Sequence, residues 1–148
     1  MSTLKILPAA ATHQVRDHCL CLAVQRAARA LARRFDDAMR PLDLTHGQFS
    51  LLMSLNRPLP PSIGEIAQFL AMDRTTTTAN IKPLERRGLL KVTVDGEDRR
   101  SRRLTLTGAG HALLIEALPL WKKTHASVDK LLAHQEPDNL RRVLALLS

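Results

Sequence analysis

The chain has 148 residues, of which 45% are hydrophobic and only 3% aromatic, with no tyrosine. This length suits one domain or one extended unit, and so few aromatics favour a core of Leu, Ala and Val packed between helices. The formal net charge of +8 favours a polyanionic partner, while no apolar run approaches the ~18 residues of a membrane span or carries an export signal. Two cysteines give no disulfide framework, so we expect a cytoplasmic protein. Binding to a membrane surface is not expected, because no basic helix carries large apolar residues opposite its charges.

Residues 1–41 are expected to form an arm followed by a long helix for dimerisation. Residues 1–11 contain several small residues and a proline, which favour a loose arm. From about His13 to Arg40, apolar residues recur at three- and four-residue spacing, which predicts a helix that ends before Pro41. A helix of that length would span about 42 Å, and a small domain could not cover its apolar stripe. A second copy of the chain is the expected cover.

Two helices are predicted to begin at capping boxes. In such a box, a Ser or Thr and a Glu or Gln three residues later satisfy backbone N–H groups at the helix start. The two boxes are Thr45 with Gln48 and Ser62 with Glu65. The helices are expected over residues 45–56 and 62–71, and the proline-rich residues 57–61 connect them.

A third helix is expected between Asp73, which can act as the N-cap, and Gly88, which can take the left-handed conformation after the last turn. Pro83 predicts either a bend near Ala79 and Asn80 or an earlier end of this helix. The spacing places Thr77, Ile81 and Leu84 on one face, and Thr75, Thr78, Lys82 and Arg86 on the opposite face.

Four consecutive threonines, residues 75–78, open this helix. Threonine is a poor helix former, but its hydroxyl suits phosphate oxygens and base edges, and its methyl suits the thymine methyl. After a first helix and a tight turn, this start is typical of a recognition helix that enters the major groove. The alternative is a surface helix with an accidental threonine run.

An arginine-rich hairpin is predicted next. Residues 91–95 and 103–107 alternate at period two, and the loop 96–102 between them is too long and too basic for a simple turn. Such a tip can place an arginine in the narrow minor groove of DNA, where the negative potential is enhanced. Alternatively, this run of charges is an ordinary solvated loop. The position of the loop beside a helix-turn-helix favours a contact with the minor groove of DNA.

The last part of the chain is expected to return to helix. Thr107 can cap a helix over residues 108–133, in which Pro119 should cause a kink. Pro137 can open a final helix with an apolar seam of Leu140, Val143, Leu144 and Leu147. The domains are therefore predicted as residues 1–41 for the arm and dimerisation helix, 42–107 for the winged helix-turn-helix, and 108–148 for the C-terminal dimerisation helices.

Several motifs taken together resemble the MarR family of bacterial transcriptional regulators. They are Leu44-Thr-x-x-Gln-Phe49, Ile63-x-x-Ile-Ala67, Leu84-Glu-Arg-Arg-Gly-Leu89, Asp98-Arg-Arg-Ser101 and Leu104-Thr-Leu-Thr-x-x-Gly110. The resemblance implies a mainly α fold with a small β-hairpin wing and an obligate two-fold dimer. It also implies that Arg100 enters the minor groove with Asp98 as its orienting carboxylate. Small aromatic ligands often bind where the dimerisation and winged domains of the family meet.

We therefore expect a homodimeric, sequence-specific DNA-binding regulator, a repressor released by a small aromatic ligand. Its recognition helices should lie about 34 Å apart on a pseudo-palindromic site in double-stranded DNA. The residues expected at the DNA are Ser62, Arg74, Thr75, Thr76, Thr77, Thr78, Asn80, Lys82, Arg86, Asp98, Arg99, Arg100 and Arg102. No motif of a catalytic, cofactor or metal site is present, so we expect no enzyme and no cofactor. A further alternative is a winged domain that binds another protein. The concentration of arginines in the wing favours DNA over a protein partner.

Cys19 and Cys21 are candidates for a redox sensor on the same scaffold. By the resemblance, Cys21 falls where the organic-peroxide-sensing branch of the family carries its reactive cysteine, although the chain lacks the tyrosines of that branch. A sensor thiol needs some exposure and a low pKa. Two small buried hydrophobic residues in a dimer helix are the commoner alternative for free cysteines. Cys21 also shares a helical face with His18, but two ligands are too few for a metal site.

Overall fold

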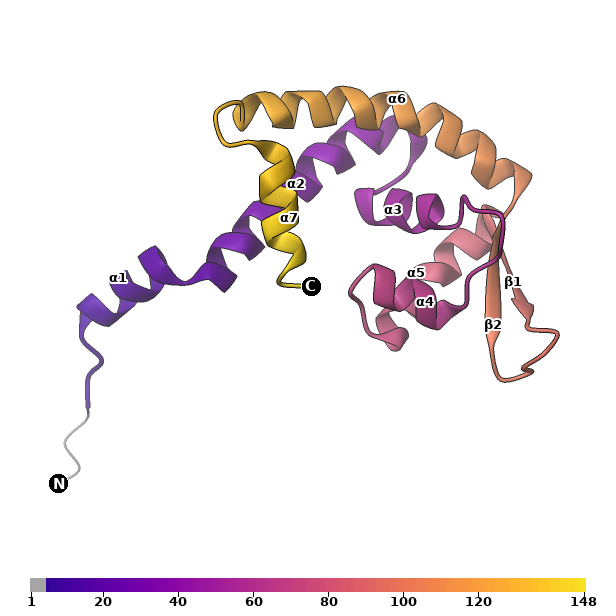
Figure 1. Ribbon diagram of the computed structural model, residues 1–148, viewed down its shortest axis with the longest axis horizontal. Helices are drawn as coiled ribbons and strands as arrows, with labels where there is room; N and C mark the ends of the chain where they lie inside the picture. The colour runs from indigo at the N-terminus through magenta and orange to yellow at the C-terminus, as the bar shows by residue number, and fades with distance from the viewer. Residues whose placement is uncertain (1–4) are drawn as a thin grey trace. The chain divides into compact units, whose positions relative to one another are not determined.

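The computed structural model describes residues 5–148, which form a mainly helical fold with one antiparallel β-hairpin (Figure 1). The elements are α1 Ala9–His18, α2 Leu20–Met39, the 3-10 helix η1 Arg40–Leu42, α3 His46–Ser54, α4 Ile63–Phe69, α5 Arg74–Arg86, β1 Leu90–Val94, β2 Arg102–Leu106, α6 Gly108–Leu131 and α7 Pro137–Ala145. By their internal contacts the residues form two compact units that meet after Arg34. The expected fold class is confirmed.

The single helix expected from His13 to Arg40 is wrong, because the chain breaks at Cys19 into α1 and α2. The Cys19 backbone is extended, with φ −76° and ψ 105°. Its N–H donates to the Val15 carbonyl oxygen at 2.9 Å and closes α1. Its Sγ accepts the Leu22 N–H at 3.4 Å, as an N-cap side chain does, so the same residue opens α2.

The first helix also begins earlier than expected, at Ala9, inside the segment predicted to be a loose arm. Pro8 stands at the N-cap with φ −62°, and three alanines follow it. Proline restricts the backbone before the first turn, and alanine has the highest helix propensity, so the short segment 9–11 joins the helix. Residues 1–4 of the predicted arm lie outside the described residues. The helix α2 ends at Met39, before Pro41 as expected.

The core of the unit 35–148 is assembled around the two capped helices α3 and α4. Both predicted capping boxes are present, and the helices end at Ser54 and Phe69, two residues before the expected positions. The most fully buried side chains are Met39, Leu51, Leu52, Pro61, Ile66, Thr77, Leu84 and Leu104. These residues come from α2, α3, α4, α5, β2 and the connector, so the helices and the hairpin share one core.

Both ends of α5 match the sequence prediction. The Asp73 side chain accepts the Thr76 N–H at 2.7 Å, and Gly88 has φ 71°. The N–H groups of Gly88 and Leu89 donate to the Glu85 and Leu84 carbonyl oxygens, which is a Schellman ending. The helix continues past Pro83 to Arg86, so the alternative of an earlier end is wrong.

The hairpin strands lie one residue earlier than predicted. Leu90 pairs with Leu106 and Val94 with Arg102, in antiparallel register. Leu90 and Leu104 lie in the core, where the hairpin packs on the helices. The Leu104 N–H donates to the Pro61 carbonyl oxygen at 2.9 Å, which joins β2 to the connector before α4.

The helix α6 begins directly after the hairpin and contacts α3. The Thr107 side chain caps it by accepting the Gly110 N–H at 3.1 Å, as predicted, and the helix runs through Pro119. The final helix α7 begins at Pro137, also as predicted. No helix among residues 5–148 is long and apolar enough to cross a membrane.

Candidate nucleic-acid interface

The helices α4 and α5 form a helix-turn-helix whose turn is held by local hydrogen bonds. Ala71 adopts the left-handed conformation with φ 53°, and the Met72 N–H donates to the Ala67 carbonyl oxygen at 2.8 Å. Asp73 then caps α5, and the hydrogen bond from the Thr76 N–H holds the pKa of the Asp73 carboxyl below its ordinary value. The turn therefore has a defined geometry that directs the first turn of α5.

The four threonines of α5 have different environments, which corrects the prediction that all of them contact DNA. Thr77 is fully buried, and its hydroxyl donates to the Asp73 carbonyl oxygen at 2.8 Å, so it belongs to the core. Thr75 and Thr76 are exposed, and Thr78 is half-buried. The helix period explains this division, since Thr77 shares the inward face with Ile81 and Leu84.

The polar residues on the outer side of α5 are available to a ligand. Arg74, Asn80, Lys82 and Arg86 are exposed. The Asn80 amide makes one weak contact, with the Met72 sulfur at 3.5 Å. Ser62 is half-buried and accepts the Glu65 N–H at 3.1 Å, so its side chain caps α4.

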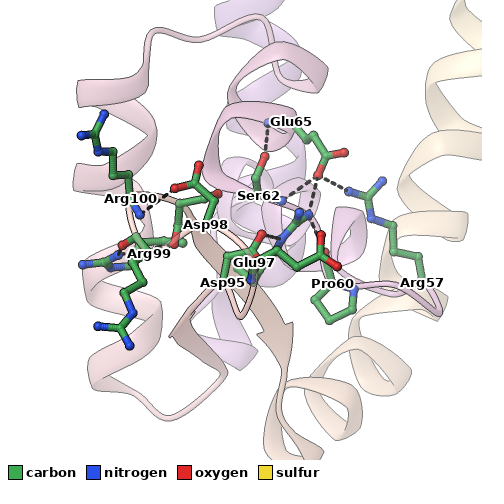
Figure 2. Close-up of polar contacts among 12 residues, drawn as sticks. Arg57, Pro60, Ser62, Glu65, Asp95, Glu97, Asp98, Arg99 and Arg100 are labelled. Carbon is green, nitrogen blue, oxygen red and sulfur yellow. Dashed lines mark hydrogen bonds and ion pairs between the residues drawn. The ribbon is translucent and has the colours of Figure 1, made fainter.

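The wing loop is shaped by its aspartates, as Figure 2 shows. Asp98, which the resemblance implied to be the orienting carboxylate of Arg100, accepts the backbone N–H of Arg100 at 3.0 Å. The Arg102 guanidinium donates to the Arg99 carbonyl oxygen at 2.9 Å. Within residues 5–148, the guanidinium groups of Arg99 and Arg100 pair with no carboxylate, and both side chains are exposed. The tip therefore presents unpaired positive charge.

Arg103 is a positioning residue that the sequence reasoning missed. It bonds to Asp95 at 2.8 Å, to the Pro60 carbonyl oxygen at 3.2 Å and to Glu65 at 3.5 Å. Arg57 approaches the same Glu65 oxygen at 3.7 Å (Figure 2). One arginine thus links the wing base, the connector and the first turn of α4. The only available sequence signal was its place opposite Thr93 in the hairpin, which does not reveal long-range partners.

Hydrogen bonds keep both carboxylates of this cluster ionised. The Glu97 N–H, followed by Arg103, lowers the pKa of Asp95. The Ser62 N–H is the main cause of the lowered pKa of Glu65, with smaller contributions from Arg103 and Arg57. The pKa of Arg103 is raised mainly by its hydrogen bond to Asp95. The cluster is charged at neutral pH and holds the wing against the helix-turn-helix.

A separate apolar cavity of about 370 Å³ lies between α3, α4 and α6. Its lining residues are Phe49, Ser50, Met53, Ser54, Phe69, Leu118 and Trp121. The rings of Phe49 and Trp121 stack with centroids 6.4 Å apart, while Phe69 is 71% exposed. No charged side chain lines this cavity, and its size matches sites for small ligands.

The two cysteines lie in the other unit, around the break between α1 and α2. Both are free thiols; Cys19 is half-buried and Cys21 is exposed, and the Gln25 amide lies 3.5 Å from the Cys21 sulfur. Among residues 5–148, no group of three or more His, Cys, Asp or Glu side chains could hold a metal ion.

The fold and sequence are similar to those of regulators solved on DNA. The transcriptional regulator MosR of M. tuberculosis, in complex with DNA, is 35% identical, and the match covers 88% of this chain and 93% of MosR with a TM-score of 0.80. The transcriptional repressor CouR, bound to a 23-mer DNA duplex, is 32% identical, and the match covers 99% of this chain and 96% of CouR with a TM-score of 0.73.

Sequence relatives agree with these structures. The MarR family profile matches residues 44–101, the segment from the start of α3 to the wing tip. The transcriptional activatory protein BadR of Rhodopseudomonas palustris is 33% identical over 94 residues, which make up 62% of this chain and 54% of BadR. The chain spans about half the length of the curated relatives it matches.

Proposed function

Since this chain belongs to the MarR family of winged helix-turn-helix transcriptional regulators, a non-enzymatic family, we propose that it binds a pseudo-palindromic DNA duplex as a homodimer. In this proposal α5 lies in the major groove and the wing tip reaches the adjacent minor groove. The bound dimer represses transcription until a small ligand releases it. CouR, a repressor, and MosR, both solved with DNA, support this reading.

The observation that carries the proposal is the set of unpaired polar groups on α5 and the wing. Arg74, Lys82 and Arg86 on α5, and Arg99 and Arg100 on the wing, are exposed and pair with no carboxylate within residues 5–148. Cations left free by the protein can replace the counterions of a phosphate backbone. Hydroxyl and amide groups on the same helix supply contacts to base edges.

Exposed apolar residues on the helices outside the winged domain support a homodimer. On α7, Leu140, Val143 and Leu144 are 38%, 49% and 40% exposed, and Leu147, which follows the helix, is 62% exposed. On the first unit, Val15 and Leu20 are 58% and 61% exposed. Stripes of this kind mark association surfaces, and a second copy supplies a matching stripe on each helix.

The DNA-binding proposal is tested by fluorescence anisotropy over a salt series, on a duplex selected by the protein from a random-sequence pool. Affinity should fall with salt at a log–log slope of about −0.9 per phosphate contacted. Arg100→Ala should cost about 1–3 kcal/mol of binding free energy. Lys123→Ala removes the same charge from α6 and should bind like the parent. Equal binding by Arg100→Ala and the parent would refute the role given to the wing.

The apolar cavity between α3, α4 and α6 is the proposed effector site. Its aromatic lining favours a flat ring, and the absence of a lining charge favours an uncharged compound. The Ser54 hydroxyl donates to the Leu51 carbonyl oxygen at 2.6 Å, so it can only accept from a ligand, whereas Ser50 can donate. A ligand in this cavity would contact the exposed Phe69 at the end of α4, and so could shift the helix-turn-helix.

A thermal-shift screen with uncharged aromatic compounds tests this site. A compound that raises the melting temperature should lose its effect in Met53→Trp, which fills the cavity. Ile115→Trp places the same side chain on an exposed position of α6 and should respond like the parent. An undiminished shift in Met53→Trp would place the effector elsewhere.

A thiol sensor is the second candidate function, favoured by the exposed Cys21 and the helix break at Cys19. An organic hydroperoxide would oxidise the Cys21 thiolate to a sulfenic acid and leave as the alcohol. The Cys19 thiol would then attack the sulfenic sulfur, which forms a disulfide and releases water. Titration of the DNA complex with cumene hydroperoxide should release the parent and leave Cys21→Ser bound. Retention of the parent protein on DNA would eliminate sensing.

A further inference from the structure

Thr76 differs from the other threonines of α5, because its hydroxyl is already bound within the protein while its side chain is exposed. Asp73 Oδ1 accepts the Thr76 N–H at 2.7 Å, and Asp73 Oδ2 lies 2.8 Å from Thr76 Oγ1. An ionised carboxylate has no proton to give, so the threonine hydroxyl donates its only proton to Asp73. These two bonds to one carboxylate fix the orientation of the side chain.

This orientation limits what Thr76 can offer to a base pair. Guanine N7 and O6, adenine N7 and thymine O4 are acceptors, as are phosphate oxygens, and each requires a donor. Thr76 could donate only by breaking its bond to Asp73. Its oxygen keeps a lone pair, which can accept only from adenine N6 or cytosine N4. The other group of this exposed side chain is the γ-methyl, and the apolar group in the major groove is the C5-methyl of thymine.

The neighbouring threonines show the contrast. The hydroxyls of Thr75 and Thr78 have no hydrogen-bond partner within residues 5–148, so both remain able to donate. Thr77 is buried and its hydroxyl is committed to the Asp73 carbonyl oxygen. The run of four identical residues therefore divides into two donors, one core residue and one exposed residue whose hydroxyl proton is already bound to Asp73.

We propose that Thr76 reads a thymine by contact between the two methyl groups, and that Asp73 is the positioning residue that keeps the Thr76 hydroxyl turned away from the DNA. This inference rests on the proposed placement of α5 in the major groove. It assigns one specificity-determining contact within that placement. It also predicts that the preference of the protein for thymine survives removal of the Thr76 hydroxyl.

The test replaces each thymine of the selected duplex by deoxyuridine, which removes only the C5-methyl. At one thymine in each half-site the parent should lose affinity about fourfold, the factor that corresponds to one buried CH2 group at 25 °C. Thr76→Val keeps the methyl and should show the same loss. Thr76→Ser keeps only the hydroxyl and should bind both duplexes equally. Far-UV circular dichroism checks that each variant remains folded.

The positioning role of Asp73 has its own readout. In Asp73→Asn the amide can donate to the Thr76 oxygen, which frees the hydroxyl proton and the rotamer, while asparagine still caps α5. The fourfold thymine preference should fall in this variant. It should return in Asp73→Asn combined with Thr76→Val, because valine has no hydroxyl to reorient. A structural role alone would not give this rescue.

The outcomes separate this inference from the proposed function. If Thr76→Ser keeps the thymine preference and Thr76→Val loses it, the hydroxyl is the reading group and the inference is overturned, while DNA binding stands. The same holds if no thymine replacement affects the parent. Binding of the parent to the selected duplex no tighter than to a scrambled duplex would overturn the proposed function and the inference together.

Discussion

At the scale of single residues, the carboxylates of the winged domain have a structural role: they fix the positions of backbone groups and arginine side chains. Asp73 holds the start of α5, Asp98 holds the wing backbone, and Asp95 holds Arg103. Each accepts hydrogen bonds from backbone N–H groups or a guanidinium, and hydrogen bonds to a charged acceptor are shorter and stronger than neutral ones. Acidic residues in the proposed DNA-binding surface therefore help determine where its cations and hydroxyls lie.

The depressed pKa of Asp73 predicts a pH dependence of stability. Because the folded-state pKa lies below the unfolded value, the ionised carboxylate stabilises the fold above about pH 4 and loses this effect as pH falls through the folded pKa. Asp73→Asn keeps the cap but cannot ionise. Thermal unfolding at a series of pH values should show the parent's advantage over Asp73→Asn at pH 7, and its decrease below about pH 4. A constant difference across the series would contradict this assignment.

At the scale of elements, the junction between the hairpin and α6 depends on one glycine. The Thr107 hydroxyl donates to the Gly88 carbonyl oxygen at 2.6 Å and accepts the Gly110 N–H at 3.1 Å. Gly110 is buried, and a Cβ there would collide with the Leu89 carbonyl oxygen and lie 2.8 Å from Leu106 Cδ1. Close packing of α6 on the hairpin thus requires a residue without a side chain.

Gly110→Ala should destabilise the protein by about 3 kcal/mol, because the clash involves backbone that cannot move without shifting the hairpin. Gly108→Ala is the matched control, since nothing lies within 4 Å of a Cβ at that position. The control should be neutral or stabilising by about 0.4–1 kcal/mol. Urea unfolding of the two variants measures the difference, and equal midpoints would disprove the packing argument.

At the scale of the whole molecule, the apolar residues divide into a buried core and an exposed set. The residues of the predicted seam, on α7 and just after it, are exposed, and Arg141 of α7 lies 3.8 Å from Asp129 of α6. A helix with an apolar face in water is well suited to association. The proposed homodimer would cover this face.

Val143→Asp with Leu144→Asp should convert the proposed dimer to a monomer, because burying two carboxylates at an apolar interface costs more than the interface gains. The variant should also bind the selected duplex more weakly, since one half-site contributes less than two. Sedimentation velocity measures the oligomeric state. Arg142→Asp changes a charge on the same helix and should remain dimeric; a dimeric double variant would exclude α7 from the interface.

Much of the fold and part of the site could be predicted from local signals. Both capping boxes, the Asp73 cap, the left-handed Gly88 and the start of α6 depend on residues three or four apart, and the structure has them as expected. The break at Cys19 was missed because both flanking segments keep a helical pattern. The orienting role of Asp98 was drawn from the resemblance and stays a prediction, and the structure shows its contact with the Arg100 backbone N–H.

The sequence by itself determined the helix-turn-helix and the basic wing, since periodicity, caps and charge act over a few residues. Only the tertiary structure decided which polar groups are free. It buried Thr77, committed the Thr76 hydroxyl to Asp73 and joined Arg103 to Pro60 and Glu65. The physical reason is that burial and hydrogen-bond pairing depend on which distant segments come into contact. The sequence around one residue does not show which segments those are.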